Sequence, residues 1–198
     1  MKIKYLFILV FSFLLSACSL FSPVKLGNES AYNVDTIPSV PVERKSSTSI
    51  LVLMPEANPA YNTTQMAYTK TPHQIAYFAQ NRWIETPSQM LLPLIVQTLQ
   101  RTKHFHAVVF PPFNGRYDYL MNTQVLEFQQ DYTRMPATFK IKVLVQLIRA
   151  VTGQVVAVRI ISSSAPIVPE SPYNGVLAAN RATSIVLRDI AEFTLDNV

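Results

Sequence analysis

One stretch of the chain has an apolar residue at every second position, and it predicts the clearest strand. Within residues 138–150 every second residue from Phe139 to Leu147 is apolar, and Lys140, Lys142 and Gln146 fall on the other face. A period of two puts one face of a strand in the core and the other in water. The segments 117–129 and 155–163 are also strand-like, the second following a Thr-Gly-Gln turn. We therefore expect a three-stranded meander.

Four shorter segments also predict strands. Residues 50–54 form an uninterrupted apolar run, which is typical of a strand buried on both faces. Residues 65–69 and 74–78 have the pattern of a hairpin joined by the linker 70–73, and residues 107–110 form one further short strand. Together with the meander, seven strands are expected.

Two segments carry the helical period instead. Thr86 and Gln89 stand three residues apart with Pro87 between them, which is the pattern of a capped helix start. Pro93 lies inside this helix and predicts a kink or a short first segment. A second helix is predicted over residues 176–195. The apolar residues expected to turn the first helix toward the core are Met90, Leu91, Leu94, Ile95 and Leu99.

The order of these elements predicts an α+β fold. Hairpin-linked strands with two helices suit a sandwich of the α/β type, in which a mixed, mostly antiparallel sheet is covered by two main helices. The domain is expected to span residues 48–198. Residues 18–47 are rich in Pro, Ser and Asn and are interpreted as a tether, although the part around residues 40–42 could lie along the domain as an edge segment.

The N-terminus has the layout of an export signal. Lys2 and Lys4 precede an apolar run over residues 5–15, which is too short to span a bilayer, and small residues lead up to Cys18. The order Leu-Ser-Ala-Cys resembles a bacterial lipobox, in which the cysteine becomes the new N-terminus and is acylated with fatty acids such as palmitate. The alternative is a plain secreted protein with a chance cysteine.

The residue after the cysteine predicts the membrane in which the protein is anchored. Bacterial lipoproteins retained at the inner membrane usually carry aspartate at this position, whereas this chain has Ser19. We therefore expect a protein anchored by lipid in the outer membrane and facing the periplasm.

Charge and cysteine content narrow the function classes. The chain carries a net charge of +5, but removing residues 1–17 as a signal peptide leaves 15 basic against 12 acidic residues, a net of +3. The basic residues are scattered, so nucleic-acid binding is not expected. With its one cysteine acylated, the mature chain has no thiol for a disulfide, and a chain that is 49% hydrophobic must rely on its core.

Motifs for catalysis or cofactor binding are absent from the sequence. It has no nucleophile elbow, no His-Glu-x-x-His helix and no phosphate-binding loop, and no cofactor is expected. His104 and His106 could share a strand face as metal ligands, but two histidines make a weak site, and a helix end is the simpler interpretation. Ser162–Ser164 could hold a nucleophile but has no evident base. We expect neither an enzyme nor a metal site.

The order of motifs in the segment 65–99 resembles a known family. This order, together with the lipobox, is similar to the ABC-type transport auxiliary lipoprotein family, the PqiC-like (YmbA-like) lipoproteins of intermembrane transport systems. Two residues depart from the family pattern: Ile84, where a small residue is usual, and Pro93. The motifs in chain order are Gln65-Met66-Ala67-Tyr68, Tyr77-Phe78-Ala79 and Arg82-Trp83-Ile84-Glu85-Thr86-Pro87 before the apolar helix.

The resemblance implies a non-catalytic partner of a lipid transporter. In such a system an ABC permease and ATPase of the inner membrane work with an MCE-domain protein that bridges the periplasm. The lipoprotein would dock the end of this bridge at the outer membrane and help lipid to pass.

Candidate partner-binding residues follow from the same segment. Tyr, Trp and Arg are the residue types that dominate binding hot spots. The favoured alternative for Trp83 is packing in the core or against the helix, with Arg82 either extending its charged end into water or paired to Glu85. The candidates are Tyr68, Tyr77, Arg82 and Trp83.

Two other functions stay open. A free-standing lipid-binding or envelope-assembly lipoprotein would be favoured by a large apolar cavity, and a periplasmic hydrolase by a cluster of catalytic side chains. The sequence does not specify the lipid, the direction of its movement or whether copies of the chain form a homo-oligomer.

Overall fold

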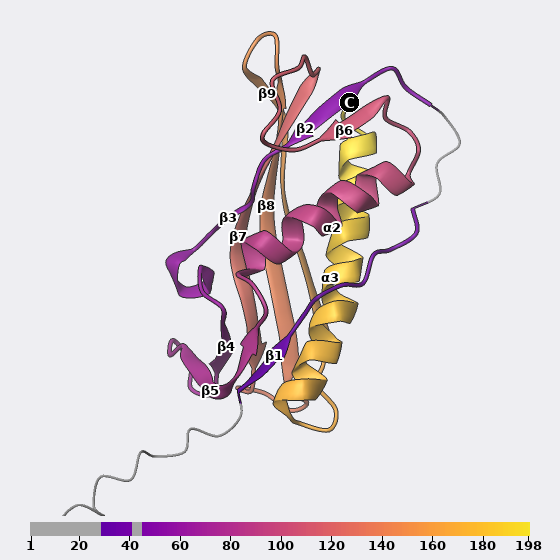
Figure 1. Ribbon diagram of the computed structural model, residues 1–198. Coiled ribbons are helices and arrows are strands. Elements are labelled where there is room, and N and C mark those ends of the chain that lie inside the picture. The colour runs from indigo at the N-terminus through magenta and orange to yellow at the C-terminus, as the bar shows by residue number, and fades with distance from the viewer. Residues whose placement is uncertain (1–28, 41–44) are drawn as a thin grey trace, which may run out of the picture.

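The computed structural model describes residues 29–40 and 45–198. The predicted signal peptide, the lipobox and Cys18 lie outside the described residues. The described chain forms one sheet, which is strongly curled, and two long helices that pack on its concave side (Figure 1). The predicted fold class, a mixed sheet covered by two helices, is confirmed.

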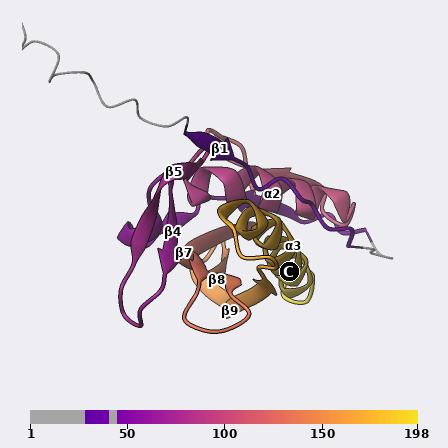
Figure 2. The same ribbon diagram turned by 90° about the horizontal axis from the view of Figure 1, so that it is seen from below.

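The predicted meander forms the main part of the sheet. It consists of β7 (Tyr119–Asp131), β8 (Thr138–Arg149) and β9 (Gln154–Pro166), each antiparallel to the next. The alternation along β8 corresponds to burial, because every second residue from Phe139 to Leu147 is buried and the residues between them are half-exposed. Seen from below, these strands form a curved row that wraps around one side of the long C-terminal helix (Figure 2).

The other edge of β7 is shared by three short parallel strands. The chain runs alongside β7 and leaves it twice, once at Pro55 and once at the 3-10 turn η2 (Pro59–Tyr61). Because proline cannot donate to a strand ladder, the edge is paired in pieces. The pieces and their outer neighbours are β2 (Ser49–Val52) beside β6 (Ala107–Val109), β3 (Glu56–Ala57), and β4 (Gln65–Thr69) beside β5 (Ala76–Trp83), with β1 (Ser30–Tyr32) outermost.

The first long helix, α2 (Pro87–Arg101), begins as the sequence predicts. The Thr86 hydroxyl accepts a hydrogen bond from the backbone N–H of Gln89, and the Gln89 side chain accepts one from the backbone N–H of Thr86. The apolar residues expected to face the core are all buried. The helix continues through Pro93, so the expected short first segment does not form.

The second long helix, α3 (Pro172–Leu195), starts one turn earlier than predicted. Ser171 caps it by accepting a hydrogen bond from the backbone N–H of Asn174, and Pro172 occupies the first turn. Ala178, Ala179 and Ala182 are fully buried, and these small side chains allow the helix to approach the sheet closely. Leu177 and Ile185 on the same helix are exposed, because they lie outside the stripe of residues that is buried.

The space between the sheet and the helices is filled with large side chains. Three aromatic rings pack together in this space in edge-to-face arrangements. The ring centroids of Trp83 and Phe128 are 5.3 Å apart, and those of Phe128 and Phe139 are 4.9 Å apart. All three side chains are at most 1% exposed. The interior of the described domain is therefore a packed core.

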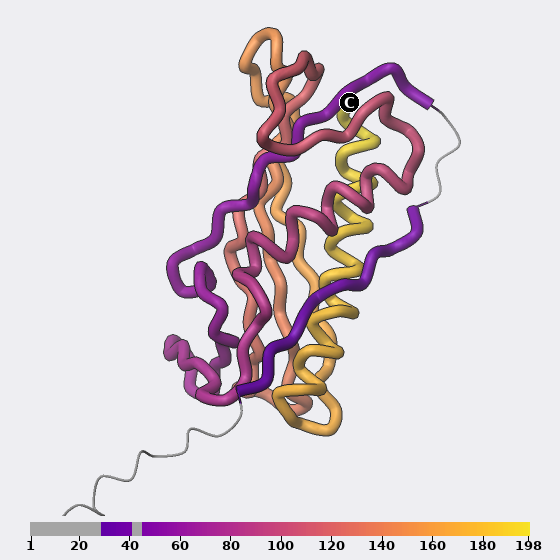
Figure 3. Tube along the Cα trace, viewed as in Figure 1, coloured from indigo at the N-terminus to yellow at the C-terminus, as the bar shows by residue number. Residues whose placement is uncertain are grey.

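Residues 29–40, which the sequence assigns to the tether, pack on the domain. They pair through β1 with β5 and then cross α3, as the Cα trace shows (Figure 3). Val34 and Val40 are buried, and the side chain of Asn180 on α3 accepts hydrogen bonds from the backbone N–H groups of Asp35 and Thr36. The packed part of the chain thus begins no later than Glu29 and includes part of the segment interpreted as a tether. We call residues 29–40 the strap.

Candidate functional site

The candidate partner-binding residues lie on the β4–β5 hairpin and its neighbours. Tyr68 is half-buried in an aromatic row, with its ring 4.5 Å from that of Phe78 and 6.4 Å from that of Tyr132. The ammonium group of Lys70 lies 5.5 Å from the centroid of the Tyr68 ring, within the range of a cation–π contact. Tyr68 is therefore part of a cluster of tilted and edge-to-face aromatic rings.

Tyr77 makes different contacts. Its hydroxyl donates a hydrogen bond to the carbonyl oxygen of Ala60, at 3.0 Å, and the side chain stays exposed. The neighbouring Tyr61 is buried, and this burial, together with the charge of Glu127 and the nearby Tyr77, raises the pKa of Tyr61 to about 12. Tyr61 thus stays neutral at ordinary pH.

Arg82 is paired, but with a different carboxylate from the one expected. Its Nε atom lies 2.8 Å from Oε2 of Glu29, at the start of the strap, and the pair with Glu85 does not form. Both side chains are more than a third exposed, so the ion pair contributes little to stability. Arg82 therefore remains available at the surface, where it joins the strap to β5.

Trp83 does not reach the surface. It is 1% exposed and packs against Phe128 and Phe139, so the alternative of a packing tryptophan describes its position. Tyr68, Tyr77 and Arg82 thus all belong to the hairpin, but the register places Tyr68 and Tyr77 on opposite faces, and Trp83 is buried in the core.

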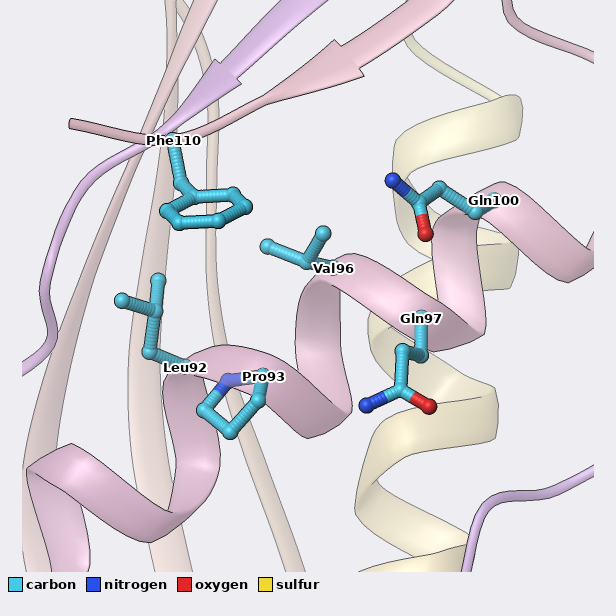
Figure 4. A pocket seen from close by; sticks show the side chains of 6 residues that line it. All are labelled: Leu92, Pro93, Val96, Gln97, Gln100 and Phe110. Atoms are coloured by element: carbon cyan, nitrogen blue, oxygen red, sulfur yellow. The ribbon is translucent and has the colours of Figure 1, made fainter. Parts of the chain in front are cut away.

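A second feature is an apolar groove beside α2, which the sequence gives no reason to expect. It has a volume of about 380 Å³ and lies between the outer side of α2 and Phe110, which follows β6 (Figure 4). Leu92, Pro93 and Val96 form its floor, and Gln97 and Gln100 stand at its rim. Its members come from two segments whose approach depends on the fold, so no local pattern could have revealed it.

The serines considered as nucleophiles lie on β9 in an open polar groove. Ser162–Ser164 share this groove with Lys140, Lys142 and Glu127. The Nζ atom of Lys142 lies 3.8 Å from Oε2 of Glu127, and the ammonium group of Lys140 is paired with the carboxylate of Asp131. The three histidines of the chain lie elsewhere, one in the hairpin linker and two after α2, so no imidazole faces these serines.

His104 and His106 follow the C-terminus of α2. The rings of His104 and Phe105 lie 5.0 Å apart. Across residues 29–40 and 45–198, no three His, Cys, Asp or Glu side chains come together as metal ligands would. A separate search of the same residues finds no helix with the length and hydropathy needed to cross a membrane.

Two structural amides, one buried and one half-buried, have no signal in the sequence, because Gln and Asn are ordinary surface residues. Gln130 is 1% exposed and accepts a hydrogen bond of 2.6 Å from the hydroxyl of Tyr132. It also packs so closely on Gly175 of α3 that a side chain there would overlap it. Asn180 holds the strap. These contacts connect α3 to both the sheet and the strap.

A curled sheet closed by two helices, with a packed interior and open surface grooves, defines an α+β domain suited to contacts at its surface. The family model for the ABC-type transport auxiliary lipoprotein component matches residues 32–191. The chain therefore belongs to this family, and the resemblance found in its motifs is confirmed.

Solved structures with the same fold share little sequence with this chain. Protein XCC0632 from Xanthomonas campestris has a TM-score of 0.78 at 20% identity, with 84% of this chain and 95% of that chain covered. Hypothetical protein CT253 from Chlamydia trachomatis has a TM-score of 0.51 at 8% identity, with 75% and 96% covered. These similarities concern the fold alone. No curated protein matches the sequence.

Proposed function

We propose that this protein is an outer-membrane lipoprotein, anchored through acylated Cys18, that docks the end of a periplasm-bridging MCE-domain protein. The bridge would belong to a transporter with an ABC permease and an ATPase in the inner membrane. The lipoprotein itself performs no catalysis in this proposal and helps lipid to pass between the bridge and the outer membrane.

The observation that carries the proposal is the extent of the family match. It covers residues 32–191, which include nearly all of the described domain, so the domain as a whole has the role of a transport auxiliary component. The packed core supports docking over carriage of lipid inside the domain, because rings such as Trp83 and Phe128 occupy the interior.

The surface that supports docking is the outer side of the β4–β5 hairpin. Tyr77 and Arg82 are both exposed by more than a third and are of the residue types that anchor interfaces. Tyr68 lies on the opposite face of the hairpin, because it pairs with Ala76 while Tyr77 pairs with Ala67. Trp83 serves the same surface indirectly, because it supports β5 from the core.

Co-purification tests the proposal. A Tyr77→Ala, Arg82→Ala double variant of the full lipidated chain should lose retention of the MCE-domain protein while keeping the wild-type circular dichroism spectrum. The matched control is Tyr117→Ala, Arg116→Ala, which removes the same two residue types from a loop near the start of β7. Full retention by the first variant would remove this surface from the interface, and equal losses in both variants would show that the effect is nonspecific.

The α2 groove favours a second candidate function, direct binding of lipid. Its volume of about 380 Å³ is within the usual range of small-molecule sites, and its floor is apolar. A fluorescent fatty acid should bind the wild-type chain, and Val96→Gln should weaken that binding. Lack of saturable binding by the wild-type chain would exclude this candidate.

A further inference from the structure

Three loops and the start of α3 meet at one end of the molecule. Strand pairing places Thr69, Asp131, Thr138 and Pro166 in one row across the sheet. The linker 70–75 follows the first of these residues, the loop 132–137 joins the next two, and the loop 167–171 follows the last. All three loops therefore emerge at the same end, which is the lower end in Figure 1 and faces the viewer in Figure 2. We call it the anchor-side end.

Each loop at this end exposes an apolar side chain. Met135 is 85% exposed, Val168 is 67% exposed and Ile75 is 40% exposed. Tyr173, in the first turn of α3, is 55% exposed. Such side chains at the tips of loops do little for the core, and their exposure to water is unfavourable. Because these side chains stand on three separate loops at one end, we expect them to contact one and the same external surface.

The charges among the tips are mainly positive. Lys70 and Arg134 are exposed on two of the loops, and Glu170 is the exposed carboxylate of the third. His73 is also exposed in the linker. Apolar and tyrosine side chains combined with cations suit the boundary between lipid headgroups and acyl chains.

The beginning of the described chain lies at the same end. β1 runs parallel to β5, so its N-terminal end points toward the hairpin linker. The ring of Tyr32 on β1 lies 6.0 Å from that of Tyr173. Cys18 precedes Glu29 by 11 positions in the sequence, which limits their separation to about 40 Å. An acylated Cys18 therefore keeps a bilayer within reach of the anchor-side end.

We infer that the anchor-side end rests on the bilayer surface, with Met135, Val168, Ile75 and Tyr173 inserted among the lipid headgroups. The inference rests on the proposed lipid anchor at Cys18. In this arrangement the strap fixes the orientation of the domain, because it holds the start of the chain beside these loops. The opposite end, with the β8–β9 turn, then faces away from the membrane.

Fluorescence quenching by lipid tests this orientation. Acylation occupies the thiol of Cys18, the one cysteine of the chain, so an introduced cysteine can be labelled selectively. The lipidated full chain, labelled with bimane at Met135→Cys or at Val168→Cys, is reconstituted into phosphatidylethanolamine and phosphatidylglycerol vesicles that contain brominated phosphatidylcholine. The control is Val151→Cys, because Val151 is 90% exposed in the turn at the opposite end.

Vesicles should blue-shift the labels at positions 135 and 168, because insertion makes their surroundings less polar, and bromolipid should quench them. The label at 151 should be unchanged in both respects. Equal quenching at the two ends, or no quenching at 135 and 168, would overturn the inference. A response of these two labels to protein concentration without vesicles would overturn it in favour of a protein interface.

Vesicle flotation separates this inference from the proposed anchor. Flotation of the chain without quenching at 135 and 168 would overturn the orientation alone. If the chain does not float, the anchor and the orientation are both overturned.

Discussion

Single residues of this protein show how burial changes the role of a side chain. Asp131 ends β7 in a largely buried position and pairs with Lys140 on the neighbouring strand. Burial alone would raise the pKa of its carboxyl. The hydrogen bonds from Lys140 and from both the hydroxyl and the backbone N–H of Thr133 outweigh it, so the net pKa is lowered.

A lowered pKa makes the contribution of Asp131 dependent on pH. The ionised carboxylate stabilises the fold above its unfolded-state pKa of about 3.9, and this stabilisation disappears as the pH falls through the lower folded-state pKa. Asp131→Asn should therefore reduce the free energy of unfolding at pH 7 by about 1–3 kcal/mol. Urea titrations should show the difference shrinking below pH ~4.

Glu170→Gln is the control for this experiment, because Glu170 is an exposed carboxylate near the same end of the sheet. It should leave the pH profile of stability unchanged. A constant difference between Asp131→Asn and the wild type from pH 7 to pH ~3 would contradict the assignment.

At the scale of elements, α2 shows that the capping residues at its start and the core packing of its apolar face favour the same helix. Thr86 and Gln89 satisfy backbone groups at the helix start, and Leu94 is buried about two turns later. Thr86→Ala should cost about 0.5–2 kcal/mol of stability. Leu94→Ala should cost more, about 2–5 kcal/mol, because it leaves a cavity in the core.

Chemical denaturation of both variants measures this order. Gln97→Ala is the control on the same helix, since Gln97 is exposed, and it should change stability by less than about 0.5 kcal/mol. If the cap variant loses more stability than the Leu94 variant, the helix depends on its start more than on its packing.

The strap depends on one side chain of α3. Asn180 accepts hydrogen bonds from the backbone of Asp35 and Thr36 and donates one to the carbonyl oxygen of Asn33, at 3.2 Å. Asn180→Ala removes all of these bonds at once. Amide hydrogen exchange at positions 35 and 36 should then accelerate, while exchange within β7 and β8 stays slow.

Arg188→Ala is the control for the strap, because Arg188 is exposed on the same helix. It should leave exchange in residues 29–40 unchanged. Protection of positions 35 and 36 that survives in Asn180→Ala would show that β1 and the buried valines hold the strap without this amide.

At the scale of the whole molecule, the proposed function begins with the anchor. Cys18→Ala should leave an unprocessed precursor and abolish labelling by a fatty-acid analogue, because acylation and cleavage both require the cysteine. Ser19→Asp is the matched variant: it should keep the label and shift the protein to inner-membrane fractions. Labelling of Cys18→Ala at the wild-type level would contradict the lipoprotein assignment.

The candidate surface was only partly predictable. The positions of Tyr68 and Tyr77 follow from the expected hairpin, in which β4 pairs with β5 and the two side chains point to opposite faces. The burial of Trp83 and the pairing of Arg82 with Glu29 depend on β7, β8 and the strap, which are distant in the sequence. Local patterns do not contain such contacts, since they require the assembled sheet.

The sequence alone determined the elements whose signals are local. Alternation defines β8, the capping box defines the start of α2, and the apolar run defines β2. The tertiary structure alone decided how β2, β3 and β4 share one edge of β7 and how residues 29–40 cross α3. Periodicity and capping depend on neighbouring residues, whereas the pairing of an edge and the docking of a strap depend on which distant surfaces can bury one another.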